Sequence, residues 1–204
     1  MKKWCWLFCA VVLLTSGGMA ADFSLNLHVD YNHGVSDYFD QSVIFLTTEG
    51  KTFIETRDNR MGFGFALSVT VPVWKRFSLQ PGIAYKYGHQ NYEYRQADND
   101  EAEPEKATHF FDLFAWNFSL VYDILRFRGD WNLNALLALG YNRFSADQEM
   151  REDERKYWSL RAGLGATFVQ IEHFGFQMLC FYEFPLSDSD LTFLGISAGI
   201  MVRF

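Results

Sequence analysis

The segment FSLNLHVDYN, residues 23–32, alternates strictly between apolar and polar side chains. Its odd positions carry Phe, Leu, Leu, Val and Tyr, and its even positions carry Ser, Asn, His, Asp and Asn. Because successive side chains of a β-strand point to opposite faces, this pattern predicts a strand whose two faces meet different surroundings. If other segments of the chain show the same alternation, the fold is a β-sheet with one apolar and one polar face.

Seven further segments repeat this two-residue alternation. In residues 62–74 the apolar face opposes a face of glycine, alanine, serine and threonine, which is small for the outer surface of a soluble protein. Residues 110–122 are apolar on both faces and give the least distinct pattern. The expected strands occupy 23–32, 62–74, 77–88, 110–122, 131–142, 158–168, 174–184 and about 191–204.

An even number of antiparallel strands brings both chain ends to one side of the sheet, so the last strand can pair with the first. Closure leaves no unpaired backbone groups in lipid. Long and short connections also alternate along the chain, which is the asymmetry of outer-membrane barrels. The long connections, expected outside the cell, lie near 33–61, 89–109, 143–157 and 185–190. We therefore predict an all-β fold, a closed antiparallel up-and-down eight-stranded transmembrane β-barrel.

The first 20 residues have the features of a secretory signal peptide. Two lysines precede an apolar run from Trp4 to Leu14, and Gly18 and Ala20 are spaced as at a signal-peptidase site. The run is shorter than the roughly 20 apolar residues that a spanning helix needs. We expect cleavage after Ala20, export through the periplasm and a mature barrel domain of residues 21–204.

Charge and cysteine content argue against several functions. The formal net charge is −7 and becomes −9 once the two lysines of the signal peptide are lost, so we expect no nucleic-acid partner. Cys180 is the one cysteine of the mature sequence, so no intramolecular disulfide can form. The five histidines show no metal-ligand spacing, and we expect no metal and no cofactor.

Taken together, the chain resembles the small eight-stranded outer-membrane barrel proteins of Gram-negative-type bacteria, the class of the outer membrane protein A barrel domain and its X-type and opacity-protein relatives. The resemblance implies a monomer in the outer membrane, surrounded by its lipid and inserted by the barrel assembly machinery. In that class a last strand that ends in Phe after alternating apolar residues is the assembly signal, a role that falls here on Ile200, Val202 and Phe204. Many members carry an aromatic residue where this chain has Val202.

Eight strands leave an interior just wide enough for side chains, which disfavours a wide channel. The side chains expected on the lumen face with polar or charged groups are His28, Asp30, Lys86, Arg161, Glu183 and Arg203. Asp30, Lys86, Arg161 and Glu183 sum to zero charge in the outer half of their strands. Because buried charges need partners, we expect these four to neutralise one another as a plug. Separate hydration of each charge by lumen water is the alternative.

The first long connection predicts a hairpin outside the membrane. Two β-prone runs flank TEGK, residues 48–51, which is a turn signal. The apolar side chains that the hairpin would present are Val43, Phe45, Phe53 and Ile54. They form either a contact surface for a host or matrix ligand or a lid over the barrel mouth.

An enzyme that modifies lipid A is a less favoured hypothesis. His33, with Ser36 and Asp37 nearby, and also His89 and His109 are candidate bases. Nucleophilic catalysis needs a base beside the hydroxyl and a third group that orients it, and no such motif is present in the sequence. We therefore predict a non-enzymatic outer-membrane barrel with a structural or surface-interaction role. A narrow porin-like channel for ions or small solutes is the alternative.

Overall fold

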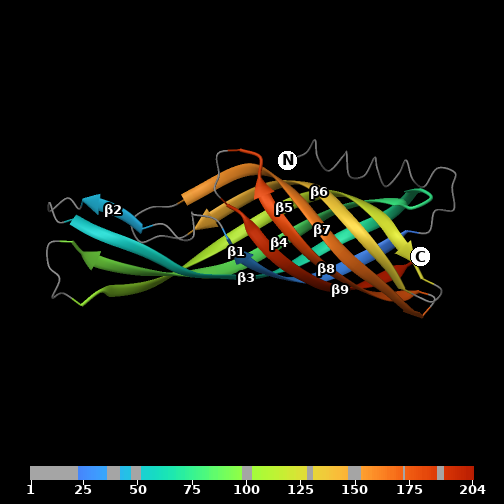
Figure 1. Cartoon of the computed structure of the whole chain (residues 1–204), viewed down its shortest axis with the longest axis horizontal. Helices are drawn as coiled ribbons and strands as arrows, with labels where there is room; N and C mark the ends of the chain where they lie inside the picture. Colours follow the sequence, from blue (N-terminus) through green and yellow to red (C-terminus); the bar gives the residue numbers. More distant parts are fainter. Residues whose placement is uncertain are drawn as a thin grey trace.

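The computed structural model describes residues 23–35, 42–46, 52–97, 103–127, 131–146, 153–171, 173–187 and 191–204. These residues form a closed ring of eight long antiparallel strands and one short extra strand (Figure 1). The predicted fold class is confirmed. The predicted signal peptide, residues 1–20, lies outside the described residues. Within the described residues, no helix has the length and apolar character needed to cross a membrane.

The strands follow one another around the ring in chain order. They are β1 (Ser24–Gly34), β2 (Ser42–Leu46), β3 (Thr52–Trp74), β4 (Phe77–Gln96), β5 (Glu105–Arg126), β6 (Trp131–Ala146), β7 (Asp153–Ile171), β8 (Phe174–Pro185) and β9 (Phe193–Arg203). From β3 to β9 each strand pairs antiparallel with the next, and β1 pairs with both β3 and β9, which closes the ring. The short strand β2 pairs with the start of β3.

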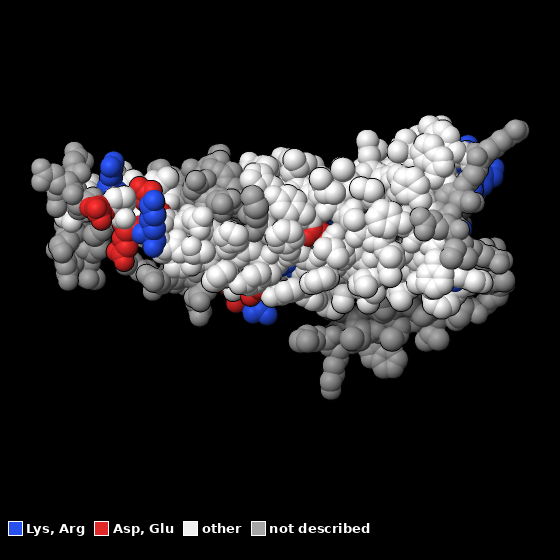
Figure 2. Space-filling model, turned by 90° about the horizontal axis from the view of Figure 1, so that it is seen from below, with Lys and Arg blue, Asp and Glu red and all other residues white. Residues whose placement is uncertain are grey.

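The ring is apolar outside, and much of its interior is polar. On β1, Leu27 is 48% exposed, whereas the neighbouring Asn26 and His28 are buried. The same alternation follows the other strands, so that leucine, phenylalanine, tryptophan and valine side chains cover the outer wall. Because water would not favour such a wall, this is the surface of a protein whose barrel spans a membrane. Figure 2 shows acidic and basic side chains together at one end of the molecule and basic side chains at the other, while the wall between them is mostly uncharged.

Several strands extend further than the sequence pattern predicts. Parts of the connections expected at 33–61, 89–109 and 143–157 are strand, because β3 begins at Thr52, β4 ends at Gln96 and β7 begins at Asp153. In β4 the alternation continues past the barrel with reversed polarity. Tyr92 is buried on the inner face, and Glu93 is exposed on the outer face. Outside the lipid the outer face of the sheet meets water and is therefore polar. In the sequence, this exchange of the polar and apolar faces looked like the end of the strand and the start of a loop.

The extended ends form a sheet beyond the ring, which we call the projecting sheet. It consists of residues 42–46, 52–61, 89–96 and 105–110 of β2, β3, β4 and β5. Figure 1 shows it standing out at the end of the barrel opposite the C-terminus. We call this end of the ring the loop end, and the other, where the two-residue connection Lys75–Arg76 joins β3 to β4, the turn end.

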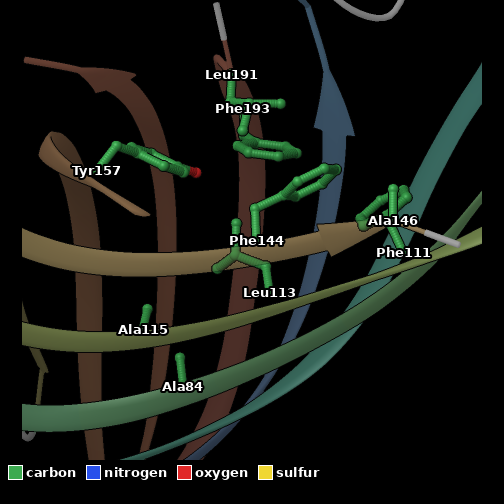
Figure 3. Packing of buried hydrophobic residues seen from close by; sticks show 9 residues of the cluster. All are labelled: Ala84, Phe111, Leu113, Ala115, Phe144, Ala146, Tyr157, Leu191 and Phe193. Carbon is green, nitrogen blue, oxygen red and sulfur yellow. The ribbon is translucent and has the colours of Figure 1, made fainter. Parts of the chain in front are cut away.

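A compact apolar cluster fills the lumen near the loop end. Its rings point into the interior from different strands (Figure 3). Phe111 pairs with Ala146, the last residue of β6, which places the cluster at the external mouth of the ring. We call this cluster the apolar layer; its members are Ala84, Phe111, Leu113, Ala115, Phe144, Ala146, Tyr157, Leu191 and Phe193. The second apolar face of residues 110–122 therefore faces the lumen and not a second lipid surface.

Candidate functional site

Three buried charges meet inside the barrel. Lys86 on β4 and Arg161 on β7 both bind Glu183 on β8. The Glu183 Oε2 atom accepts hydrogen bonds from Lys86 Nζ at 3.0 Å and from Arg161 Nη2 at 2.7 Å. Its Oε1 atom accepts one from the Ser159 hydroxyl at 2.9 Å. We call these four residues the ion cluster. Each carboxylate oxygen is bonded, as a buried charge requires.

Aromatic rings contact the two cations of this cluster. The guanidinium carbon of Arg161 lies 4.4 Å from the ring centre of Phe181, and Lys86 Nζ lies 5.3 Å from that of Phe193. Cations are attracted to the faces of aromatic rings, and more strongly when water is excluded. Phe193 also belongs to the apolar layer, so the ion cluster and the apolar layer are in contact. Together they occupy the lumen at the loop end.

Asp30 lies near the ion cluster, and its charge acts on both Lys86 and Arg161. It is 2% exposed and faces the lumen from β1, but within the described part of the chain it forms no salt bridge. With Arg161 and His28 it lines a pocket of about 50 Å³ on the turn-end side of the cluster. His28 Nδ1 lies 3.0 Å from the Ser197 hydroxyl, and its Nε2 has no hydrogen-bond partner among the residues that the structure describes. A pocket of this size with unpaired polar atoms has room for water.

A larger polar vestibule opens at the turn end. Its volume is about 670 Å³, and Arg203 and His173 are among its lining residues. Asn134 and Gln177 line both this vestibule and the smaller pocket, so the two are neighbours along the lumen. Arg203 therefore faces the lumen at the turn end, and the smaller pocket lies between it and the ion cluster. Polar side chains line the barrel from the turn end as far as the ion cluster.

Two residues of the predicted assembly signal, Ile200 and Val202, lie on the outer wall of β9, and Phe204 follows its last residue. Ile200 is 52% exposed, and Val202 has the same parity. The ring of Phe204 stacks on that of Phe23 with centres 5.1 Å apart, and the Phe204 amide donates to the Phe23 carbonyl at 3.0 Å. The C-terminus is thus tied to the start of β1 where the ring closes. A role as an assembly signal stays a prediction.

The predicted hairpin residues lie in the projecting sheet. Phe45 pairs with Phe53, and Val43 pairs with Glu55, in the β2–β3 ladder. The side chains of Val43, Phe45 and Phe53 lie outside the described residues. Ile54 is partly exposed, and its partner Ile44 is 68% exposed. The predicted hairpin is therefore present as the antiparallel pair of β2 and β3, with β2 as the outer strand.

Sequence reasoning missed the aromatic half of the lumen site. Side chains an even number of residues apart on one strand point to the same face of the barrel. By this rule Phe181, Phe193 and Phe144 face the lumen, as Glu183, Ser197 and Asn142 on the same strands do. The sequence alone could therefore have placed these three rings in the lumen. Ser159 also has it, next to Arg161. Among the described residues, no group of His, Cys, Asp and Glu is placed to hold a metal ion.

An eight-stranded ring, apolar outside and polar inside, is the architecture of a small outer-membrane β-barrel. No protein-family model matches the chain, and no curated protein matches its sequence. Solved structures do match its fold. Neisserial surface protein A, NspA, is 14% identical, with a TM-score of 0.57 over 89% of this chain and 97% of that one.

Two further solved barrels have the same architecture. Ail, the attachment invasion locus protein of Yersinia pestis, solved with the heparin analogue sucrose octasulfate, is 15% identical; the TM-score is 0.54 over 91% of this chain and 100% of that one. The N-terminal β-barrel domain of Pseudomonas aeruginosa OprF is 10% identical; the TM-score is 0.50 over 90% and 99%. At these identities the likeness shows the fold alone.

Proposed function

We propose that this protein is a non-enzymatic, non-conducting barrel of the outer membrane that uses its projecting sheet to contact a partner protein at the cell surface. The observation that carries this proposal is the sheet itself. Strands β3, β4 and β5 continue well past the ring, and β2 extends the sheet by one strand (Figure 1). A barrel that served only to span the membrane would not need this extension.

The state of the lumen supports a role outside the barrel. The polar pockets lie on the turn-end side of the ion cluster and the apolar layer. On the loop-end side, the described part of the lumen is occupied by side chains such as Phe144 and Leu113, which are almost fully buried. Eight-stranded barrels have little interior space to spare. The narrow channel remains the alternative function, and its polar pockets near the turn end are the observation in its favour.

The projecting sheet has a surface suited to recognition by another protein. Its outer face carries charges of both signs, with Glu93 paired across the ladder with Lys106. The strand β2 is the last in the sheet order, and Ile44 on it is strongly exposed. Terminal strands offer backbone groups to which an extended partner segment can add.

The names of two solved neighbours, a surface protein and an attachment and invasion protein, agree with a surface role. Ail was solved with a polyanionic heparin analogue, but charge argues against such a ligand here. The sequence 89–109 carries six acids against Arg95 and Lys106, and the whole chain has a net charge of −7. A polyanion would be repelled, and we therefore favour a protein partner of the host or its matrix.

Adherence of intact bacteria tests the proposal. Cells that carry the protein with residues 42–57 deleted should bind immobilised matrix proteins or host cells at the level of cells that lack the protein. The chain in the outer-membrane fraction should begin at Ala21 in both cases, which checks signal cleavage and location.

A second variant serves as the matched control. Replacing residues 147–152 with a glycine and serine linker alters another loop-end connection and should leave adherence at the wild-type level. Unchanged adherence of the 42–57 deletion, with equal amounts of folded protein at the surface, would refute the proposed role of the projecting sheet.

A further inference from the structure

The vestibule at the turn end has the size of a ligand pocket. Its volume is about 670 Å³, and pockets that hold small molecules typically measure about 300–1,000 Å³. All eight long strands contribute residues to its wall. On its inner side it adjoins the small pocket beside His28, with which it shares Asn134 and Gln177. The vestibule is therefore a cup inside the barrel that is reached from the turn end.

The wall of this cup carries neutral hydrogen-bonding groups. Hydroxyl and carboxamide side chains from six strands line it: Ser24, Thr70, Ser78, Asn132, Thr167 and Gln177. The Gln177 Oε1 atom accepts no hydrogen bond from the described residues, and the side chains of Ser78 and Asn132 form none with them. Hydroxyl and amide groups offer both donors and acceptors, which are the partners that the hydroxyls of a polyol or sugar require.

Basic side chains surround the opening of the cup. Lys75 and Arg126 lie on neighbouring connections, where Arg126 Nη2 donates to the Lys75 carbonyl oxygen at 2.9 Å. Arg203 and His173 lie together on another part of the rim, where the Arg203 amide donates to the His173 carbonyl oxygen at 2.8 Å. Figure 2 shows basic side chains at this end of the molecule, on the right.

Two of these cations have no carboxylate partner in the described part of the chain. Arg126 is paired with Asp123, whose Oδ2 atom lies 2.6 Å from Arg126 Nη2. The partly buried guanidinium of Arg203 forms no ion pair with a described residue, although the carboxylate of Phe204 is close along the chain. Lys75 Nζ lies over the Trp74 ring, 5.8 Å from its centre. The cup therefore presents positive charge beside its neutral polar wall.

We propose that the vestibule binds a phosphorylated polyol or sugar. Arg203 holds the phosphate through charge-assisted hydrogen bonds, and Lys75 adds charge at the rim. The hydroxyl and amide groups of the wall bind the hydroxyls of the ligand. A phosphate ester has about two charges and three acceptor oxygens, so it engages more than one cation. Free polyol phosphates and the glycerol phosphate headgroup of an inner-leaflet lipid share this chemistry.

Solution NMR of the refolded protein in micelles of an amine-oxide detergent, which has neither phosphate nor sugar, tests the site. During titration with glycerol 3-phosphate the side-chain amide signals of Asn132 and Gln177 should shift and saturate, and that of Asn91 in the projecting sheet should stay in place. Arg203→Gln should weaken binding about tenfold through loss of a charge-assisted hydrogen bond. Arg143→Gln removes the same charge from the outer wall and is the control, expected to bind like the wild type.

A second pair of probes tests the recognition of hydroxyl groups. Ser78→Ala with Asn132→Ala should weaken the binding of glycerol 3-phosphate, followed at Gln177, and leave the binding of inorganic phosphate unchanged. Equal effects on both probes would overturn the assignment to a polyol. Lys75→Asn is a further variant that does not depend on the folding of Arg203→Gln, because asparagine tolerates the positive φ of 39° at this position. It should also weaken the binding of both probes.

The two sources of the ligand are separated by adding phosphatidylglycerol to the micelles. Shifts with glycerol 3-phosphate would assign the site to a free ligand, and shifts with phosphatidylglycerol alone would assign it to a lipid headgroup; both results support the site. No shift of Asn132 and Gln177 with either probe would overturn it. Equal losses of affinity in Arg203→Gln and the control Arg143→Gln would do the same, because binding would then follow net charge and not the vestibule.

Discussion

Glu183 connects the two buried cations of the lumen. Lys86 reaches it from β4, whereas Arg161 is its direct neighbour in the β7–β8 ladder. Both cations are almost fully enclosed, and within the described residues each forms its direct salt bridge with this carboxylate. Removal of a shared partner is more disruptive than removal of either cation, because it leaves two like charges buried near each other.

The substitution Glu183→Gln should strongly destabilise the barrel. It removes the one carboxylate that is bonded to both Lys86 and Arg161 and leaves only the more distant charge of Asp30. Loss of one partner of a buried ion pair costs about 3–5 kcal/mol. Urea unfolding of the protein refolded in detergent micelles, followed by tryptophan fluorescence, would measure the change in free energy of unfolding. Glu154→Gln is the control, since its carboxylate is on the exposed outer wall and its loss should leave the unfolding midpoint unchanged. An unshifted midpoint for Glu183→Gln would mean that the ion pairs contribute no net stability.

The contact between β1 and β9 determines how closely the ring can close. Gly199 on β9 faces His28 on β1. A Cβ atom at Gly199 would contact the Leu27 carbonyl oxygen and lie 2.9 Å from the Cα atom of His28. These are backbone atoms held in the ladder, and they cannot move aside as a flexible side chain can. Glycine is therefore required at this point of closure.

A comparison of the variants Gly199→Ala and Gly62→Ala tests whether the close contact between β1 and β9 requires glycine. Gly199→Ala should destabilise the barrel by about 1–3 kcal/mol through overpacking against the neighbouring strand. At Gly62 on β3, the nearest atom to an added Cβ is the Tyr87 carbonyl oxygen at 3.4 Å, an ordinary contact. Gly62→Ala should thus be neutral or stabilising by up to about 1 kcal/mol, because alanine restricts the unfolded chain. Equal unfolding midpoints for the two variants would show that the β1–β9 contact can relax.

The alternation of single strands was readable in the sequence, but the partners across the lumen were not. Parity alone placed Lys86, Arg161 and Glu183 on the inner face. Which of them meet depends on the relative shift of strands around the whole ring, which no local pattern encodes. Asp30 has the same parity as the others and was expected in the same plug. It forms no salt bridge among the described residues, but it faces a pocket that Arg161 also lines, and its charge acts on both cations.

The apolar layer and the projecting sheet were harder to recognise for different reasons. Phe144 and Phe193 come from separate strands, and one aromatic residue per strand at a lumen position gives no signal until the strands are assembled. In the projecting sheet the polar and apolar faces exchange sides where the chain leaves the membrane. Residues 89–96 of β4 were consequently placed in a loop, whereas the strand around Phe53 was predicted as one arm of a hairpin.

At the scale of the whole molecule, the ion cluster and the apolar layer follow one another along the lumen, and we predict that both act as seals. The ion cluster is linked to the apolar layer through Phe193, which contacts Lys86 and packs with Leu191 and Phe144. The vestibule and the small pocket lie together on the turn-end side. Water and ions that enter from the periplasm should therefore reach His28 but go no further. An apolar constriction resists wetting, and a neutralised ion cluster offers no free charge to a passing ion.

Single-channel recording of the refolded protein in planar bilayers with symmetric salt tests this arrangement. We expect no current steps from the wild type at either polarity. Phe144→Ala with Phe193→Ala should also remain silent, because the ion cluster still spans the lumen. Steps are expected only when Lys86→Ala and Glu183→Ala are added to that variant, with folding verified by heat-modifiable gel mobility. Steady steps from the wild type would instead favour the narrow channel, and steps from Phe144→Ala, Phe193→Ala alone would show that the ion cluster is not a seal.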